Sequence, residues 1–144
     1  AGGNGQGGGL NQLQYPTYLF VDQQQNVYVS DFYNHRVMKW NKGATEGIVV
    51  AGGQGAGSAL TQFDGPLGLF LDTLGTLYVA DFGNYRVMRW TQGDNKKGTV
   101  IEGGNGAGAG ANQLNGSVGL SFDQHGNLYV ANYNNHRVQR FSIE

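Results

Sequence analysis

The chain contains three copies of one 14-residue sequence motif. The copies run from Val27 to Trp40, from Leu77 to Trp90 and, with more differences, from Leu128 to Phe141. The starting points are 50 and then 51 residues apart. A fixed period of this size is typical of solenoids and propellers, in which each repeat forms one unit of a continuous stack. The period therefore limits the possible folds before any single residue is considered.

The composition favours an all-β protein and excludes several classes of function. Only 13% of the residues are charged and 26 of 144 are Gly, while eight Tyr, seven Phe and two Trp supply ring area for a packed core. A net charge of −1 lacks the basic surplus expected of a nucleic-acid-binding protein. The absence of Cys excludes disulfides and Cys-based metal sites, and no apolar run is long enough to span a membrane. The sequence assigns no cellular compartment.

Each repeat alternates short apolar runs with turn signals. In the second repeat this pattern predicts strands at 67–71, 76–80, 85–90 and 99–101. Asp72 and Gly75 are suited to close a hairpin between the first two strands, and Gly83 and Asn84 are predicted to adopt left-handed conformations in the next turn. Four strands in about 50 residues correspond to one propeller blade.

The other repeats follow the same plan. The first predicts strands at 18–21, 27–30, 36–40 and 48–50, whereas the third predicts strands at 118–122, 128–131 and 137–143 and lacks an outer fourth strand. The Gly-rich segment 1–9 is predicted to be a link between blades; it contains G-x-G-x-x-G at 3–8, but no helix follows it as a nucleotide site requires. We therefore expect a single repeat domain over 1–144, divided at about 1–50, 51–101 and 102–144.

The segments around the repeated Arg resemble a known repeat. They read NHRV at 34–37, NYRV at 84–87 and NHRV at 135–138, each after a Tyr-Val segment and a Gly-rich link. This pattern resembles the NHL repeat, and the resemblance covers nearly the whole chain. It implies a β-propeller fold, and NHL propellers have six blades, so the three blades here would form half of a ring.

An open arc of three blades would expose two large apolar faces, which soluble proteins avoid. Two copies related by a two-fold axis would close a six-bladed ring, each joint pairing the third blade of one copy with the first blade of the other. The alternative is that the segment belongs to a longer chain with more repeats. The start at Ala1 without Met favours either processing or such an origin.

One acidic or amide residue in each repeat precedes an Arg by five residues. We predict that these residues act as structural tethers through a charge-assisted hydrogen bond across a tight turn; the pairs are Asp31 and Arg36, Asp81 and Arg86, and Asn132 and Arg137. A carboxylate is replaced by an amide in the third pair. That replacement suits a structural role better than a catalytic one.

Another carboxylate ends each innermost predicted strand: Asp22, Asp72 and Asp123. In a ring these three residues are weak candidates for a shared metal site near the axis, and capping of their hairpin turns explains them equally well. His35 and His136 occupy equivalent turns, where the middle repeat has Tyr85, and His125 lies in a different hairpin. A position that accepts Tyr is a poor zinc ligand, so we assign no metal, cofactor or catalytic residue.

The leading hypothesis is a non-catalytic binding or assembly scaffold that self-associates. A lectin-like carbohydrate-binding propeller is the alternative, based on the polar and aromatic run at 11–15, and a channel-centred metal-dependent lyase or hydrolase is third. The expected partners are a second copy of the chain and a protein or glycan ligand. Nucleic acid is disfavoured, because ten acidic residues offset the basic side chains of the third strands, and no membrane partner is expected. Asn115 begins a lone glycosylation sequon.

Overall fold

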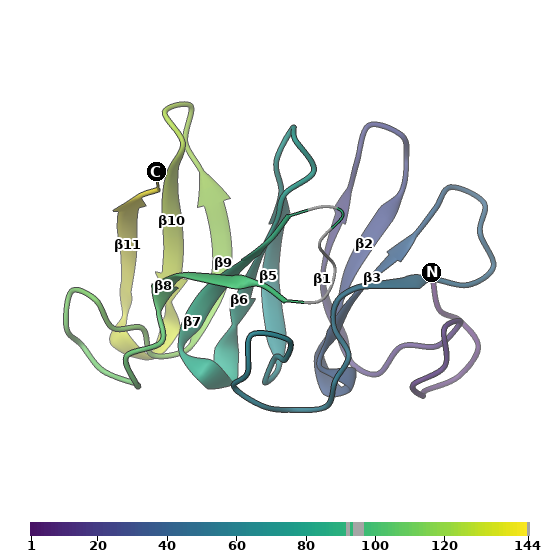
Figure 1. Cartoon of the computed structure of the whole chain (residues 1–144), viewed down its shortest axis with the longest axis horizontal. Helices are drawn as coiled ribbons and strands as arrows, with labels where there is room; N and C mark the ends of the chain where they lie inside the picture. The colour runs from purple at the N-terminus through teal and green to yellow at the C-terminus, as the bar shows by residue number, and fades with distance from the viewer. Residues whose placement is uncertain (92, 94–96, 144) are drawn as a thin grey trace.

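Three antiparallel sheets stand side by side in a row (Figure 1). The computed structural model describes residues 1–91, 93 and 97–143, and the first and third sheets lie at opposite ends of the row (Figure 1). Within these residues the secondary structure consists of strands and three short 3-10 helices. None of the helices in the described part of the chain is long and apolar enough to cross a membrane.

The first two sheets have four strands each and the third has three, and we call them blades 1, 2 and 3. Blade 1 contains β1 (Pro16–Val21), β2 (Val27–Asp31), β3 (Arg36–Trp40) and β4 (Ile48–Gly52). Blade 2 contains β5 (Pro66–Leu71), β6 (Leu77–Asp81), β7 (Arg86–Trp90) and β8 (Thr99–Gly103). Blade 3 contains β9 (Ser117–Phe122), β10 (Asn127–Asn132) and β11 (Arg137–Ser142).

The all-β prediction is confirmed, and every predicted strand lies within two residues of an observed one. The turn between the second and third strands differs from the prediction. It is a 3-10 helix in each blade: η1 (Phe32–Asn34), η2 (Phe82–Asn84) and η3 (Tyr133–Asn135). The left-handed residue is the one that follows each helix, with φ of 50° at His35, 52° at Tyr85 and 51° at His136. The prediction that Gly83 and Asn84 adopt this conformation is wrong, because the reversal occurs at the helix C-cap.

Apolar side chains fill the spaces between neighbouring blades. At the first joint, Val37 of blade 1 packs with Phe63, Leu69 and Val79 from the link and strands of blade 2. At the second joint, Val87 of blade 2 packs with Leu114 and Leu128 of the third repeat. Blade stacking, rather than any single sheet, therefore creates the hydrophobic core, as expected of a repeat protein.

The innermost strands β5 and β9 approach closely at Gly68. A methyl group at this position would overlap the carbonyl oxygen of Val118, which is backbone and cannot rotate away. Gly119 occupies the equivalent position in blade 3, and a methyl group there would have only the Cβ of Ala131 near it, at 3.8 Å.

We therefore expect Gly68→Ala to lower the free energy of unfolding by about 1–3 kcal/mol, because overpacking must push blades 2 and 3 apart. The matched control, Gly119→Ala, is expected to change it by less than about 1 kcal/mol. Urea denaturation of the two variants measures the difference. Equal losses for the two variants would show that the close approach of β5 and β9 is not the cause.

Candidate functional site

Two of the three predicted tether pairs form buried ion pairs. Arg36 Nε donates a hydrogen bond to Asp31 Oδ2 at 2.7 Å, and Arg86 Nε donates to Asp81 Oδ2 at the same distance. All four residues are buried. Because Arg36 and Arg86 lie inside the blades, they do not contribute to a basic surface.

Each pair also holds the Gly-rich link that precedes its blade. In blade 2 the second carboxylate oxygen of Asp81 accepts the backbone N–H of Asp64 at 2.8 Å, and the guanidinium of Arg86 donates to the carbonyl oxygens of Ser58, Ala59 and Gln62. Blade 1 repeats this arrangement with the carbonyls of Gly8, Gly9 and Gln12. Burial raises the pKa of Asp81, although hydrogen bonds from Asp64, Asn84 and Arg86 oppose this rise.

The third pair does not form. Asn132 Oδ1 accepts the backbone N–H of Asn115, and Asn132 Nδ2 donates to Gln139, so no acceptor is left for the Nε of Arg137. This Nε is buried, and it has no hydrogen-bond partner among the described residues. The predicted tether between Asn132 and Arg137 is therefore absent, because an amide has one acceptor oxygen where a carboxylate has two.

The carboxylates at the ends of the innermost strands cap their own hairpins. Asp72 Oδ1 accepts the backbone N–H groups of Leu74 and Thr76, and Asp22 and Asp123 accept the corresponding groups of Asn26 and Asn127. Side-chain and backbone hydrogen bonds from Asn127 lower the pKa of Asp123 to about 2. Within the described residues, no three acidic or His side chains gather where they could hold a metal ion.

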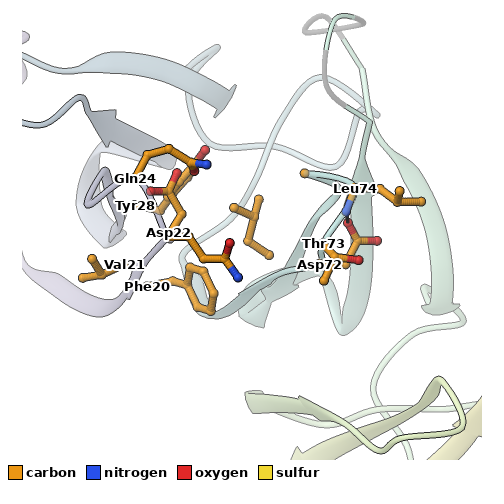
Figure 2. Close-up of a pocket in the computed structure, with 11 residues that line it drawn as sticks. Phe20, Val21, Asp22, Gln24, Tyr28, Asp72, Thr73 and Leu74 are labelled. Carbon is orange, nitrogen blue, oxygen red and sulfur yellow. Dashed lines mark hydrogen bonds between the residues drawn. The ribbon is translucent and has the colours of Figure 1, made fainter.

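A groove lies at the first joint between the hairpins of blades 1 and 2. Figure 2 shows Asp22 and Gln24 on one side of it and Asp72, Thr73 and Leu74 on the other. Its volume is about 370 Å³, and Phe20, Tyr28 and Leu71 supply its apolar and aromatic lining. The sequence did not reveal this groove, because it arises from the spacing of two hairpins that are 50 residues apart.

A second groove of about 570 Å³ lies at the second joint. It shares Asp72 with the first groove and adds Phe70, Tyr78, Phe122 and Asp123, together with the cationic side chain of Arg89. Burial, followed by the negative charge of Asp72, raises the pKa of Tyr78. The joints therefore present related grooves with different balances of charge.

The three His residues have separate surroundings. His35 Nδ1 accepts the backbone N–H of Gly65 at 3.1 Å and lies 3.9 Å from Asp64 Oδ1, so it takes part in the first joint. His136 occupies the equivalent place in blade 3 and lines a hollow on its outer end face, together with Tyr133 and Val138. His125 lies in the hairpin between β9 and β10.

The two ends of the row expose side chains whose counterparts are buried at the joints. Leu19 of blade 1 is 67% exposed, whereas its equivalent in blade 2, Leu69, is 8% exposed. Val138 of blade 3 is 68% exposed, whereas its equivalents Val37 and Val87 are fully buried. The first end face contains Leu19 and Val21, and the second contains Tyr133 and Val138.

Comparison with known proteins identifies the type of repeat. The sequence model of the NHL repeat family matches residues 114–141. A search of curated proteins gave no significant match. The match confirms the resemblance for the third repeat: residues 114–141 are an NHL repeat, and the three sheets of the chain have the fold of β-propeller blades.

Solved structures show the same fold at low sequence identity. A Bacteroides thetaiotaomicron protein of unknown function is 20% identical with a TM-score of 0.74, over 90% of this chain and 35% of that one. An auxiliary nutrient binding protein from the same organism is 16% identical with a TM-score of 0.70, over 88% and 37%. A chain of a nidogen/laminin complex is 19% identical with a TM-score of 0.67, over 91% and 44%. The chain thus spans less than half the length of these structures.

Proposed function

We propose that the chain is a non-catalytic NHL propeller module that binds other macromolecules and associates with a second copy of itself to close a ring. The observation that carries this proposal is the exposure of Leu19 and Val138 at the two end faces, because the counterparts of Val138 are fully buried at the internal joints and those of Leu19 are buried (Leu69) or partly buried (Leu120). Exposed apolar faces of this kind are typical of protein interfaces.

The internal joints indicate how the end faces would meet. Val37 packs in the first core with Leu69 and Leu71, so its equivalent Val138 would pack against Leu19 and Val21 of a second copy. Two copies arranged around a two-fold axis would form two such joints and leave no end face exposed. This head-to-tail pairing would bury the same apolar positions as the two internal joints.

One residue prevents the new joint from copying the internal ones. Tyr15 stands where blades 2 and 3 have Gly65 and Gly116. A Cβ at Gly65 would lie 2.7 Å from the ring of Phe32, and Tyr133 takes the place of Phe32 in blade 3. At the new joint the Cβ of Tyr15 would meet the ring of Tyr133. Ring closure therefore requires this exposed ring to adopt a different position from that of Phe32 at the first joint.

The non-catalytic part of the proposal is supported by the surroundings of the titratable groups. His35 is held at the first joint, His136 lies on the outer end face, and His125 lies in a hairpin. The carboxylates of Asp22, Asp72 and Asp123 are engaged by the backbones of their own turns. These residues serve the blades and their joints.

Light scattering coupled to size-exclusion chromatography, over a dilution series, tests the self-association. We expect a mass of twice 15.4 kDa that falls toward one chain only on dilution. A mass of one chain at every concentration would overturn ring closure. A mass that grows without limit as the concentration rises would also overturn it, because a closed ring has no free end face.

A further inference from the structure

We propose that the joint between two copies is completed by a hydrogen bond from the backbone N–H of Tyr15 in one copy to the side chain of His136 in the other, and that acid opens the ring by protonating this side chain. This inference rests on the ring closure proposed above, and it names a polar contact of that joint and the way in which the joint is regulated. The first internal joint contains the same type of contact within one chain.

At the first joint a His side chain connects the end of a 3-10 helix to the entry of the next blade. His35 follows η1 with φ of 50°, and its Nδ1 accepts the backbone N–H of Gly65 at 3.1 Å. A ring nitrogen of His accepts a hydrogen bond only when it carries no proton. Asp64 Oδ1 lies 3.9 Å from the same nitrogen, so the first joint has a counter-charge for a protonated His35.

The two halves of this contact recur on the end faces, one at each end of the row (Figure 1). His136 follows η3 with φ of 51°, is exposed, and its ring forms no hydrogen bond with the described part of the chain. Tyr15 occupies the position of Gly65 and has the same left-handed backbone, with φ of 61° against 72°. The N–H of Tyr15 likewise bonds to none of the described residues. The donor and the acceptor of the missing joint are therefore both available.

The chain on either side of this N–H is fixed in place. The carbonyl oxygen of Tyr15 accepts the N–H of Phe32, and the preceding N–H, from Gln14, donates to Asp31 at 2.7 Å. The entry to blade 2 forms the same two bonds at its own positions. Blade 1 therefore presents the N–H of Tyr15 without a cost of ordering on association.

Within its own chain, His136 has a cationic neighbour. The hollow that it lines also contains Tyr133 and Arg137, and none of the described residues that line this hollow is acidic. Arg stays charged at all these pH values, and Tyr loses its proton only in alkaline solution. His136 is therefore the group of this hollow that changes charge between about pH 5 and pH 8.

The second copy would bring no free carboxylate to the ring. Gln14 stands where blade 2 has Asp64. The carboxylate that binds the N–H of Gln14 belongs to Asp31, which is fully buried in its ion pair with Arg36. Ala1 lines the same hollow as Tyr15, and its amino group is a cation.

Protonation of His136 therefore opposes the joint. It would turn Nδ1 from an acceptor into a donor that faces the N–H of Tyr15, and it would place a charge in the joint without a counter-charge. The joint favours the neutral ring, so association is strongest at pH values where His is neutral and weakens as the pH falls through the range in which His takes up a proton.

The second joint supplies a natural variant of this position. Tyr85 takes the place of His35 there, with φ of 52°, and packs against the apolar cluster of that joint. His136→Tyr should therefore fold and pack in the new joint, but without an acceptor that a proton can block.

The test is light scattering over a dilution series at about pH 7.5 and about pH 5.5, with Trp fluorescence to verify that the chains stay folded. For the wild type we expect the concentration of half-association to be about tenfold higher at the lower pH, because two equivalent joints each lose a hydrogen bond. His136→Tyr is expected to associate equally at both pH values. His125→Tyr is the matched control: its hairpin lies at the opposite end of β10 from η3, so it should keep the wild-type difference.

A second variant restores the missing counter-charge. Gln14→Asp would place a carboxylate beside His136 in the way that Asp64 lies beside His35. A protonated ring would then form an ion pair across the joint. We expect the difference between the two pH values to disappear in this variant.

Equal pH effects in the wild type and in His136→Tyr would overturn the proposal, and so would a pH effect that Gln14→Asp leaves unchanged. Gln14→Asp decides the question if His136→Tyr fails to fold. A wild type that forms two-chain rings equally well at both pH values would overturn this contact and leave ring closure standing. A single-chain mass at both pH values would overturn ring closure itself, and this contact with it.

Discussion

Replacing Asp81 with Asn is expected to lower the free energy of unfolding by about 3 kcal/mol, the range for breaking a buried ion pair. The Asn side chain can still accept the N–H of Asp64, but its NH2 group would replace the oxygen that accepts from Arg86 and Asn84. The buried guanidinium would then lose its counter-charge. Denaturant unfolding followed by the fluorescence of the two Trp residues measures the loss.

The converse substitution, from Asn to Asp, can be made at the equivalent position in blade 3. Asn132→Asp would give the unpartnered Nε of Arg137 an acceptor, so we expect a gain of about 1 kcal/mol. The gain is smaller than the loss at Asp81 because Arg137 is more exposed than Arg86, and solvent weakens the new ion pair. Gln139 can rotate its amide and donate to the new carboxylate, although this rotation gives up its exposed hydrogen bond to the carbonyl oxygen of Ala111.

Opposite signs for Asp81→Asn and Asn132→Asp are the decisive result. If both substitutions destabilised the chain, the Asn in blade 3 would be optimal in its own setting, and the gain expected from Asn132→Asp would be wrong. If neither had an effect, the contacts of the Arg with the link carbonyls alone would hold the link.

The repeat pattern predicted the blades well because each strand and turn is a local feature. Hydrophobic alternation and turn residues located every strand within two residues, and the period assigned the strands to three sheets. The prediction failed where local preference and geometry disagree. Gly83 and Asn84 have the residue types that tolerate positive φ, but the helical turn placed the reversal on Tyr85, whose N–H bonds to Phe82 at the C-cap.

The binding features were harder to predict, for two physical reasons. The Arg36 and Arg86 side chains donate mainly to backbone carbonyls, and every residue offers a carbonyl, so sequence does not reveal these partners. The groove in Figure 2 depends on how two hairpins sit across a joint, which the period alone does not determine. The failure of the third tether was likewise hidden, since Asn132 and Gln139 pair only once β10 and β11 are side by side.

The exposed Val at the end of blade 3 makes the strongest prediction for assembly. Val138→Asp is expected to abolish self-association, because a carboxylate would enter a joint that the internal copies fill with apolar side chains. The variant should remain folded, since Val138 is exposed in the single chain. Leu74→Asp is the matched control: it places the same charge on an exposed hairpin tip away from both end faces and should associate as the wild type does.

Tyr15→Gly tests the same joint from the other side and should have the opposite effect. Tyr15 holds φ of 61°, where the equivalent Gly65 and Gly116 have 72° and 73°. Gly removes this strain and also removes the Cβ that conflicts with Tyr133, so the two-chain form should persist to lower concentrations. Light scattering over a dilution series measures both variants. Stronger association of Tyr15→Gly with none in Val138→Asp supports a joint built like the internal ones, whereas weaker association of Tyr15→Gly would show that the copies meet elsewhere.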